Sequence, residues 1–91
     1  MTAQSELESL LAFPCDFPIK VMGESEHGFA QAVTDIVLRH APDFDPATTE
    51  MRRSRLGTYI SLTVTIQARS REQLDALYQE LCDHPMVKMV L

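Results

Sequence analysis

Apolar and polar residues alternate most regularly in one stretch of the chain. Within residues 58–67, TYISLTVTIQ, the apolar positions are Ile60, Leu62, Val64 and Ile66. The residues between them carry hydroxyl or amide groups, and nearly all of the stretch favours a pleated surface. A period of two predicts a strand with one buried and one exposed face. We therefore expect Leu62 and Val64 to lie at the centre of the core.

Shorter patterns predict three further strands. The first covers FPIKVMG, residues 17–23, in which every second residue is apolar and faces one side. The second covers residues 48–54, in a register that buries Met51, and a hairpin turn follows it in which Gly57 can adopt a positive φ. The last strand covers residues 86–91, at the end of the chain.

Two helices are predicted from apolar residues at helical spacing. The first has its expected N-cap at Ser25 and runs to about His40, before Pro42 stops it. The second opens with SREQ, residues 70–73, where Ser at the cap is followed three residues later by Gln. This spacing is that of a capping box, in which the two side chains bond the free backbone N–H groups of the first turn.

The predicted order of elements is β-α-β-β-α-β. Right-handed crossovers then place both helices on one face of a four-stranded antiparallel sheet, the ferredoxin-like two-layer sandwich of the α+β class. The strands over 17–23 and 58–67 become central, and the other two become edges. We expect a ferredoxin-like domain over residues 15–91 and an extension over residues 1–14 with one short helix. The other sheet face stays open, and we expect function there or in the loops at its ends.

Size and charge restrict the classes of function. Ninety-one residues make one domain, and the formal net charge of -5 disfavours broad binding to nucleic acid, which needs a basic footprint. No apolar run approaches the ~20 residues of a membrane span, so no membrane association is expected. The N-terminus lacks the basic start of a secretory signal. The two distant cysteines, Cys15 and Cys82, fit a reducing compartment, so the expected location is cytoplasmic.

A cluster of three arginines interrupts this acidic chain. Arg52, Arg53 and Arg55 lie within four positions: the first two are near the end of the predicted second strand, and Arg55 opens the hairpin connection RLG that follows it. The favoured interpretation is edge protection, because charged edge strands resist pairing with another sheet. The alternative is a site for an anion. RNA binding is disfavoured, because the central strands do not offer the stacking aromatic residues that such sheets need.

The open face combines cations with hydroxyl groups. Its expected outward residues form the candidate ligand or partner face, which comprises Lys20, Met22, Arg52, Tyr59, Ser61, Thr63 and Lys88. Such a surface can hold a small carboxylate or an acidic segment of another protein. The plainer interpretation is a solvated outer face, since polar residues are ordinary on the exposed side of a half-buried sheet.

Catalytic, metal and cofactor sites find little support in the sequence. Cys82 and His84 have only one residue between them, and Cys15 has no nearby partner, so a four-ligand zinc site is not expected. None of the three histidines has a Ser, Cys or carboxylate placed to form a triad with it. Glycine-rich phosphate loops are absent from the sequence. We therefore expect no catalytic residues and no cofactor.

Five segments carry a family resemblance: LLAFPCDFPIKVMG (10–23), VLRHAP (37–42), GTYISLTVTIQA (57–68), LYQEL (77–81) and VKMVL (87–91). Together they resemble the YbeD-like family of small bacterial proteins of unknown function. The resemblance covers nearly the whole chain. It implies a ferredoxin-like fold similar to the ACT-type regulatory domains of amino-acid metabolism, and it supplies no established catalytic residues.

These inferences favour one role and leave others open. The expected role is a non-catalytic regulatory or adaptor domain that binds a small anionic metabolite or a protein partner through its sheet. The alternative is a subunit that self-associates into a homo-oligomer and has no small ligand. An enzyme or an RNA-binding protein is a more distant alternative.

Overall fold

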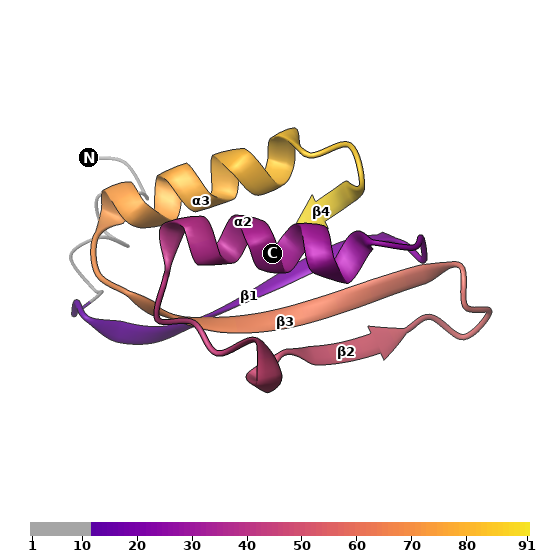
Figure 1. The fold of residues 1–91 in the computed structure, drawn as a ribbon, viewed down its shortest axis with the longest axis horizontal. Helices are drawn as coiled ribbons and strands as arrows, with labels where there is room; N and C mark the ends of the chain where they lie inside the picture. Colours follow the sequence, from indigo (N-terminus) through magenta and orange to yellow (C-terminus); the bar gives the residue numbers. More distant parts are fainter. Residues whose placement is uncertain (1–11) are drawn as a thin grey trace.

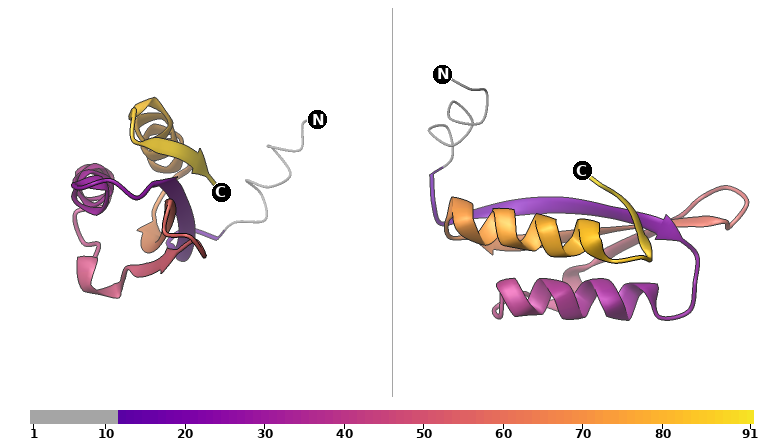
Figure 2. Two further views of the ribbon diagram at one scale, coloured as in Figure 1. Left: turned by 90° about the vertical axis from the view of Figure 1, so that its right-hand side faces the viewer. Right: turned by 90° about the horizontal axis from the view of Figure 1, so that it is seen from above.

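The computed structural model describes residues 12–91, which form two layers (Figure 1). The sheet contains β1 (Cys15–Glu24), β2 (Glu50–Arg53), β3 (Tyr59–Ala68) and β4 (Val87–Val90). Helices α2 (Phe29–His40) and α3 (Arg71–Asp83) cover one face of this sheet (Figure 2). The predicted ferredoxin-like fold is confirmed. The short helix predicted near the N-terminus lies outside the described residues.

The strand order in the sheet is β2-β3-β1-β4, and every pair is antiparallel. Strands β1 and β3 pair along their whole length, from Cys15 opposite Ala68 to Glu24 opposite Tyr59. The prediction that these two strands are central and that β2 and β4 are edges is therefore confirmed. Within residues 12–91, no helix combines the length and apolar character needed to cross a membrane.

The core lies between the helices and the apolar sides of the two central strands. The side chains of Ile19, Val21, Leu62 and Val64 are 0% exposed. They pack in one cluster with helix residues that include Phe29, Val33, Val37, Leu77 and Leu81. Burying each such side chain contributes about 1.5–3 kcal/mol relative to leaving it in water. The predicted central positions of Leu62 and Val64 are correct.

Helix α2 begins later than predicted. Its N-cap is Gly28, which has a φ of 88°, and no side chain caps the helix. Ser25 is not the cap, because its backbone N–H donates to the carbonyl of Thr58 at 2.8 Å and so continues the sheet past the end of β1. The chain must then turn before the helix can start, and glycine adopts the required positive φ without a steric cost.

Helix α3 begins as predicted, and its cap also joins neighbouring elements. The Ser70 hydroxyl accepts a hydrogen bond from the Gln73 backbone N–H at 3.1 Å. The Gln73 side chain accepts one from the Arg69 N–H at 2.6 Å and donates to the His40 carbonyl at 2.9 Å. The capping-box prediction is confirmed for Ser70, whereas the Gln73 side chain accepts from the Arg69 N–H instead of the Ser70 N–H. Its bond to the His40 carbonyl ties the end of α2 to the start of α3.

Strand β2 is shorter and more exposed than predicted. A short 3-10 helix, η1 (Pro46–Thr48), occupies the chain before it, and all four residues of the strand are exposed. Met51 faces the helix side, opposite Leu62, yet 53% of its surface is exposed. The predicted burial of Met51 is wrong, because β2 lies beyond the edge of the helix layer (Figure 2). Gly57 in the following turn has the expected positive φ, 77°.

The opposite edge is tightly packed around one glycine. Strand β4 pairs with β1 through an irregular register at Met22 and Gly23. A Cβ atom on Gly23 would lie 2.3 Å from the carbonyl oxygen of Met86 and 2.5 Å from the ring of Phe29. No side chain fits there, so Gly23 allows β4 to lie against the core.

Candidate binding surface around strand β2

The register brings the predicted open-face residues into two rows that cross three strands. In the first row Ser61 of β3 lies between Met22 of β1 and Arg52 of β2. In the second row Thr63 lies between Lys20 and Glu50. Cross-strand neighbours on one face approach closely enough for their side chains to interact. Four of these six side chains are polar or positively charged groups that can bond an anion or an acidic side chain, and the exceptions are Met22 and Glu50.

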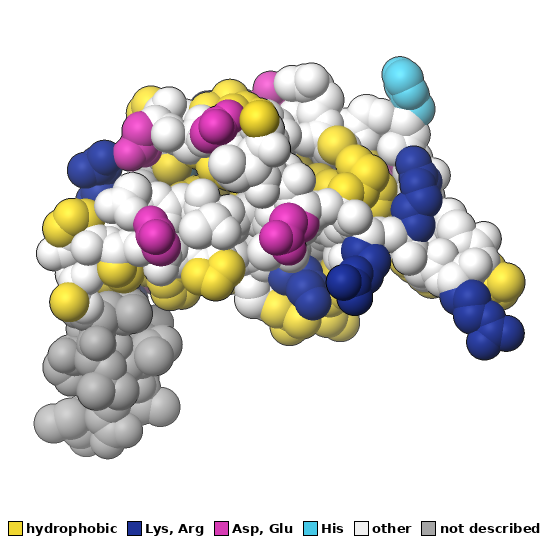
Figure 3. Space-filling view, turned by 90° about the horizontal axis from the view of Figure 1, so that it is seen from below, with side chains coloured by type: hydrophobic (Ala, Val, Ile, Leu, Met, Phe, Trp, Pro, Cys, Tyr) yellow, Lys and Arg dark blue, Asp and Glu magenta, His cyan; other side chains and the backbone are white. Residues whose placement is uncertain are grey.

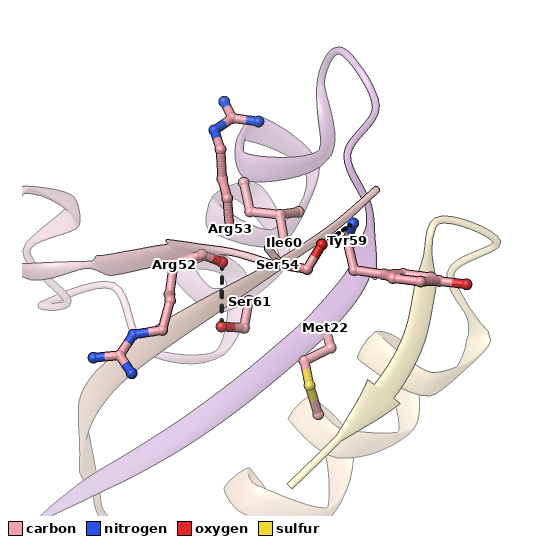
Figure 4. A pocket seen from close by; sticks show the side chains of 7 residues that line it. All are labelled: Met22, Arg52, Arg53, Ser54, Tyr59, Ile60 and Ser61. Atoms are coloured by element: carbon pink, nitrogen blue, oxygen red, sulfur yellow. Dashed lines mark hydrogen bonds between the residues drawn. The ribbon is translucent and has the colours of Figure 1, made fainter. Parts of the chain in front are cut away.

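A shallow hollow of about 180 Å³ lies along the first row, where β2 meets β3 (Figure 4). It is lined by Met22, Arg52, Arg53, Ser54, Tyr59, Ile60 and Ser61. The Ser61 hydroxyl lies 3.5 Å from the Arg52 carbonyl, and the Ser54 hydroxyl accepts from the Tyr59 N–H at 3.0 Å. The side chains of Arg52 and Arg53 point to opposite sides of the strand (Figure 4).

A second hollow of about 500 Å³ lies along the second row. Its lining contains two cations, Lys20 and Arg52, one carboxylate, Glu50, and the hydroxyls of Ser61 and Thr63. Its volume falls within the ~300–1,000 Å³ that is usual for small-molecule sites, whereas the first hollow is smaller. Arg52 and Ser61 line both hollows, so the two form one continuous surface.

Two predicted residues contribute little to this surface. Lys88 is on β4, on the far side of β1, between the positions that pair with Met22 and Gly23. It lines neither of the two hollows. Tyr59 lines the smaller hollow, but its ring points away from Arg52 and is half exposed (Figure 4). The cations of the surface are therefore Lys20 and Arg52, with Arg53 on the reverse side.

A third hollow, of about 650 Å³, opens on the helix side of β2, and the sequence did not predict it. It lies between residues 25–31 and the side chains of Met51, Arg53 and Ile60. Arg53 reaches across it, and its Nη1 donates to the Ser25 hydroxyl at 2.7 Å. The expected register did place Arg53 on this side, but the position of Ser25 depends on the turn after β1.

The arginines of the hairpin differ from the other arginines in their partners. Outside the hairpin, Arg39 pairs with Glu80, Arg69 with Asp43 at 2.6 Å, and Arg71 with Asp75 at 3.3 Å.

In the hairpin, the side chains of Arg52 and Arg55 have no hydrogen-bond or ion-pair partner among residues 12–91, and Arg53 bonds only the neutral Ser25. Seen from below, most Lys and Arg side chains gather on the half of the surface that carries this hairpin (Figure 3). The hairpin therefore presents uncompensated positive charge on an acidic protein.

The helix layer has a charged cluster of a different kind. Glu80 of α3 bonds Arg39 and also His40, with 2.7 Å between its Oε1 and the His40 Nε2. These bonds, the one from Arg39 first, hold the pKa of Glu80 down at about 2. Because each charge in this cluster already has a partner, the cluster fastens α2 to α3 and leaves no free cation for a ligand.

The geometry around β2 supports binding rather than an identifiable reaction. Guanidinium groups recognise carboxylates and phosphates through paired N–H bonds, and the serine and threonine hydroxyls can add further bonds. Within residues 12–91, no three His, Cys, Asp or Glu side chains are grouped closely enough to hold a metal ion. The groups around β2 are thus ones that can form hydrogen bonds and ion pairs with an anion.

Comparison with known proteins extends the resemblance found in the sequence. A family model described as "Protein of unknown function (DUF493)" matches residues 8–91. A UPF0250 protein from Nitrosomonas europaea is 64% identical over 84 residues, which cover 92% of this chain and 97% of the relative. A UPF0250 protein from Bordetella pertussis is 57% identical, with 92% of each chain covered.

Solved structures with a similar fold have much lower identity. The crystal structure of the ACT domain from the GTP pyrophosphokinase of Chlorobium tepidum matches with a TM-score of 0.64 and 19% identity, and 85% of this chain and 97% of that one are covered. Protein HP0495 from H. pylori matches with a TM-score of 0.68 and 11% identity over 89% and 85% of the two chains. These likenesses show the fold alone. The chain belongs to the DUF493 (UPF0250) family, as its resemblance to the YbeD-like proteins predicted, and it has the ACT-like form of the ferredoxin fold.

Proposed function

We propose that this protein is a non-catalytic regulatory or adaptor domain that binds an anionic ligand or partner through the sheet around β2. The observation that carries the proposal is the unequal pairing of the arginines. Arg39, Arg69 and Arg71 each bond a carboxylate, whereas Arg52 and Arg55 have no side-chain partner among residues 12–91. Unpaired cations beside hydroxyl-lined hollows provide the groups that a carboxylate or phosphate needs.

The ACT-like fold supports the regulatory part of this proposal by analogy only, because one fold can host many functions. The surface itself supports the binding part. Arg52 and Ser61 line both open-face hollows, and Lys20 adds a second cation in the larger one. A ligand seated there would replace the solvent that now surrounds these charges, and its binding would weaken as salt screens them.

Thermal denaturation with a panel of small dicarboxylates, phosphates and acidic peptides tests the proposal. We expect at least one class of anion to raise the melting temperature saturably at low salt, and Arg52→Gln to abolish the rise. Arg69→Gln is the matched control, because it removes one positive charge from the far end of β3, where Arg69 already bonds Asp43. A response that is equal in both variants, or no response to any anion, would contradict the proposal.

Self-association along β2 is a second candidate, and one observation favours it. Glu50 and Arg52 lie on the same face, two residues apart. If two antiparallel copies of β2 were centred on Met51, each Glu50 would face the Arg52 of the other copy, and opposite charges at such positions stabilise strand pairing. Sedimentation of the wild type and of Glu50→Arg distinguishes this candidate, since the reversal would dissociate such a dimer and leave a monomer unchanged.

A further inference from the structure

We infer that the outer edge of β2 is a docking strand for an extended, acidic segment of a partner protein, which would add to the sheet as a fifth strand. The inference rests on the proposed function and narrows it, because it selects a peptide rather than a small anion. Strand addition of this kind combines main-chain hydrogen bonds, which give affinity, with side-chain contacts on alternate residues, which give specificity.

The backbone of β2 has free groups along its outer side. The Ser54 N–H donates to the Tyr59 carbonyl at 2.9 Å, so Ser54 and Tyr59 form a hydrogen-bonded pair. In an antiparallel ladder such pairs alternate with non-bonded ones, so Arg52 also turns its backbone groups towards β3. Met51 and Arg53 must then turn their N–H and C=O groups outward. Two donors and two acceptors are therefore available to an incoming strand.

The outer side of β2 is also open to solvent in the described chain. All four strand residues are exposed, and within residues 12–91 the only strand that pairs with β2 is β3. The other edge strand, β4, pairs with β1 through an irregular register at Met22 and Gly23, and such irregularities disturb the regular edge that an incoming strand needs. The β2 edge is thus the better template for strand addition.

Charge selects the chemistry of the partner. Arg52 projects on the open face of the sheet, Arg53 projects on the helix face, and Arg55 lies in the turn beyond them. An added strand would therefore meet a cation on each of its two faces. Carboxylates at these positions would form cross-strand pairs with arginines that have no acidic partner among residues 12–91.

The shape of the surface favours a strand that also carries an apolar residue. Met51 is 53% exposed on the helix face, and it borders the 650 Å³ hollow that Ile60 and Phe29 also line. An apolar side chain of the partner, next to Met51, would cover this surface. The smaller open-face hollow, at about 180 Å³, is by contrast below the ~300 Å³ usual for a small-molecule site.

Fluorescence anisotropy with labelled, capped octapeptides tests the inference. One peptide repeats Glu-Glu-Val-Val, which places carboxylates and apolar residues on both faces of a strand, and its control repeats Lys-Lys-Val-Val. We expect the Glu/Val peptide to bind the full chain in a salt-dependent manner and the Lys/Val peptide not to bind. Replacing Arg52 and Arg53 together by Thr should remove the binding, while Arg69→Thr should leave it unchanged.

A proline substitution separates the edge hydrogen bonds from the charges. Met51→Pro removes one outward N–H and keeps every arginine, and proline is tolerated on an edge strand where its nitrogen faces solvent. We expect Met51→Pro to weaken Glu/Val binding about tenfold, the effect of losing one hydrogen bond of ~1.4 kcal/mol. Met51→Thr is the matched control, because it removes the same side chain and keeps the N–H, so the tenfold difference is measured between Met51→Pro and Met51→Thr.

Peptides N-methylated on alternate residues provide a second test that does not change the protein. Methylation of the set that faces β2 should abolish binding, and methylation of the other set should preserve it.

If the Glu/Val peptide still binds after either set is methylated, and also binds Met51→Pro, the anion-binding function stands and strand addition is wrong. If Lys/Val binds equally well, the charge argument is wrong. If no peptide binds and light scattering shows a dimer that Met51→Pro dissociates, the edge belongs to a second copy. If neither peptides nor small anions bind, both proposals fail.

Discussion

Strands β2 and β3 are neighbours in one ladder, yet they differ in burial at the same level of the sheet. Leu62 of β3 is 0% exposed, whereas Met51, directly opposite it on β2 and on the same side, is 53% exposed. The helix layer ends between them, so it covers β3 and leaves β2 in solvent (Figure 2). An apolar residue on the helix side of an edge strand is therefore not a core residue by position alone.

The two strands consequently have different roles. Strand β3 alternates between buried apolar and partly exposed polar residues, and it carries the packing that holds the fold together. Strand β2 is exposed on both faces and carries two of the three hairpin arginines. Strand β3 therefore contributes most to stability, and β2 carries the free charge. Substitutions in β3 should affect folding, whereas substitutions in β2 should affect binding.

The largest expected effect on stability comes from a substitution at the buried residue of this cross-strand pair. Leu62→Ala should lower the free energy of unfolding by about 2–5 kcal/mol, because it removes a fully buried side chain and leaves a cavity. Met51→Ala, the cross-strand control, should change it by no more than ~0.5 kcal/mol, as exposed sites do. Urea denaturation measures both values. Equal losses in the two variants would mean that β2 is covered as well as β3.

The next effect tests the packing at the opposite edge. Gly23→Ala should cost about 1–3 kcal/mol, because the added Cβ would meet the Met86 carbonyl and the Phe29 ring and force both to move. Gly57→Ala in the hairpin turn meets no neighbouring atom within 4 Å, and its cost of about 1–2 kcal/mol comes from the positive φ. Thermal denaturation of Asn variants separates the two causes: Asn tolerates a positive φ, so it should be better accepted at Gly57 than at Gly23.

A smaller change in the free energy of unfolding is expected when the pH is lowered, because of the charged cluster in the helix layer. The pKa of Glu80 is lowered to about 2 by its bonds to Arg39 and His40. A carboxyl group whose pKa is lower in the folded than in the unfolded state stabilises the fold at pH values above the ordinary carboxyl pKa. This contribution is lost as the pH falls towards 2. Between pH 5 and pH 2, Glu80→Gln should therefore lose less stability than the wild type in urea titrations. Glu26→Gln, which changes an exposed loop carboxylate, should follow the wild type over the same range.

The smallest effect on stability, and the sharpest test of β2, is the joint replacement of Arg52, Arg53 and Arg55 by Thr. The free energy of unfolding should change by no more than ~0.5 kcal/mol per site, because the charges are exposed. If edge protection is their role, light scattering should show association that increases with protein concentration, since the edge becomes flat, β-prone and uncharged. A variant that stays monodisperse but loses its acidic ligand would show instead that the arginines serve recognition.

Much of the fold follows from local patterns in the sequence. The alternation in residues 58–67 predicted β3 and its buried side, and the Ser70 cap predicted the start of α3. The order of elements then predicted which strands are central, because the crossover rule leaves few topologies. These predictions succeeded because each depends on residues that are close in sequence, or on a rule of chain connection.

The errors concern features that depend on distant parts of the chain. Ser25 has the chemistry of an N-cap, but its N–H donates to the carbonyl of Thr58 and so keeps Ser25 in the sheet. The helix therefore begins only after Gly28. Met51 has the hydrophobicity of a core residue, but the two helices do not reach it. In the candidate site, the register correctly grouped Lys20, Met22, Arg52, Ser61 and Thr63. It could not show that Arg52 and Arg55 have no partner among residues 12–91, because such partners would have come from other elements.

The side chain of Gln73 has a consequence for how the molecule opens. One amide group bonds the Arg69 N–H and the His40 carbonyl, and it lies 3.4 Å from the Gln67 carbonyl. The hydrogen bonds of this one side chain thus hold together the end of α2, the end of β3 and the start of α3, although His40 and Gln73 are far apart in sequence. Local fraying of one element would break the bonds of the others, so the amide hydrogens in this corner should exchange with solvent together rather than one element at a time.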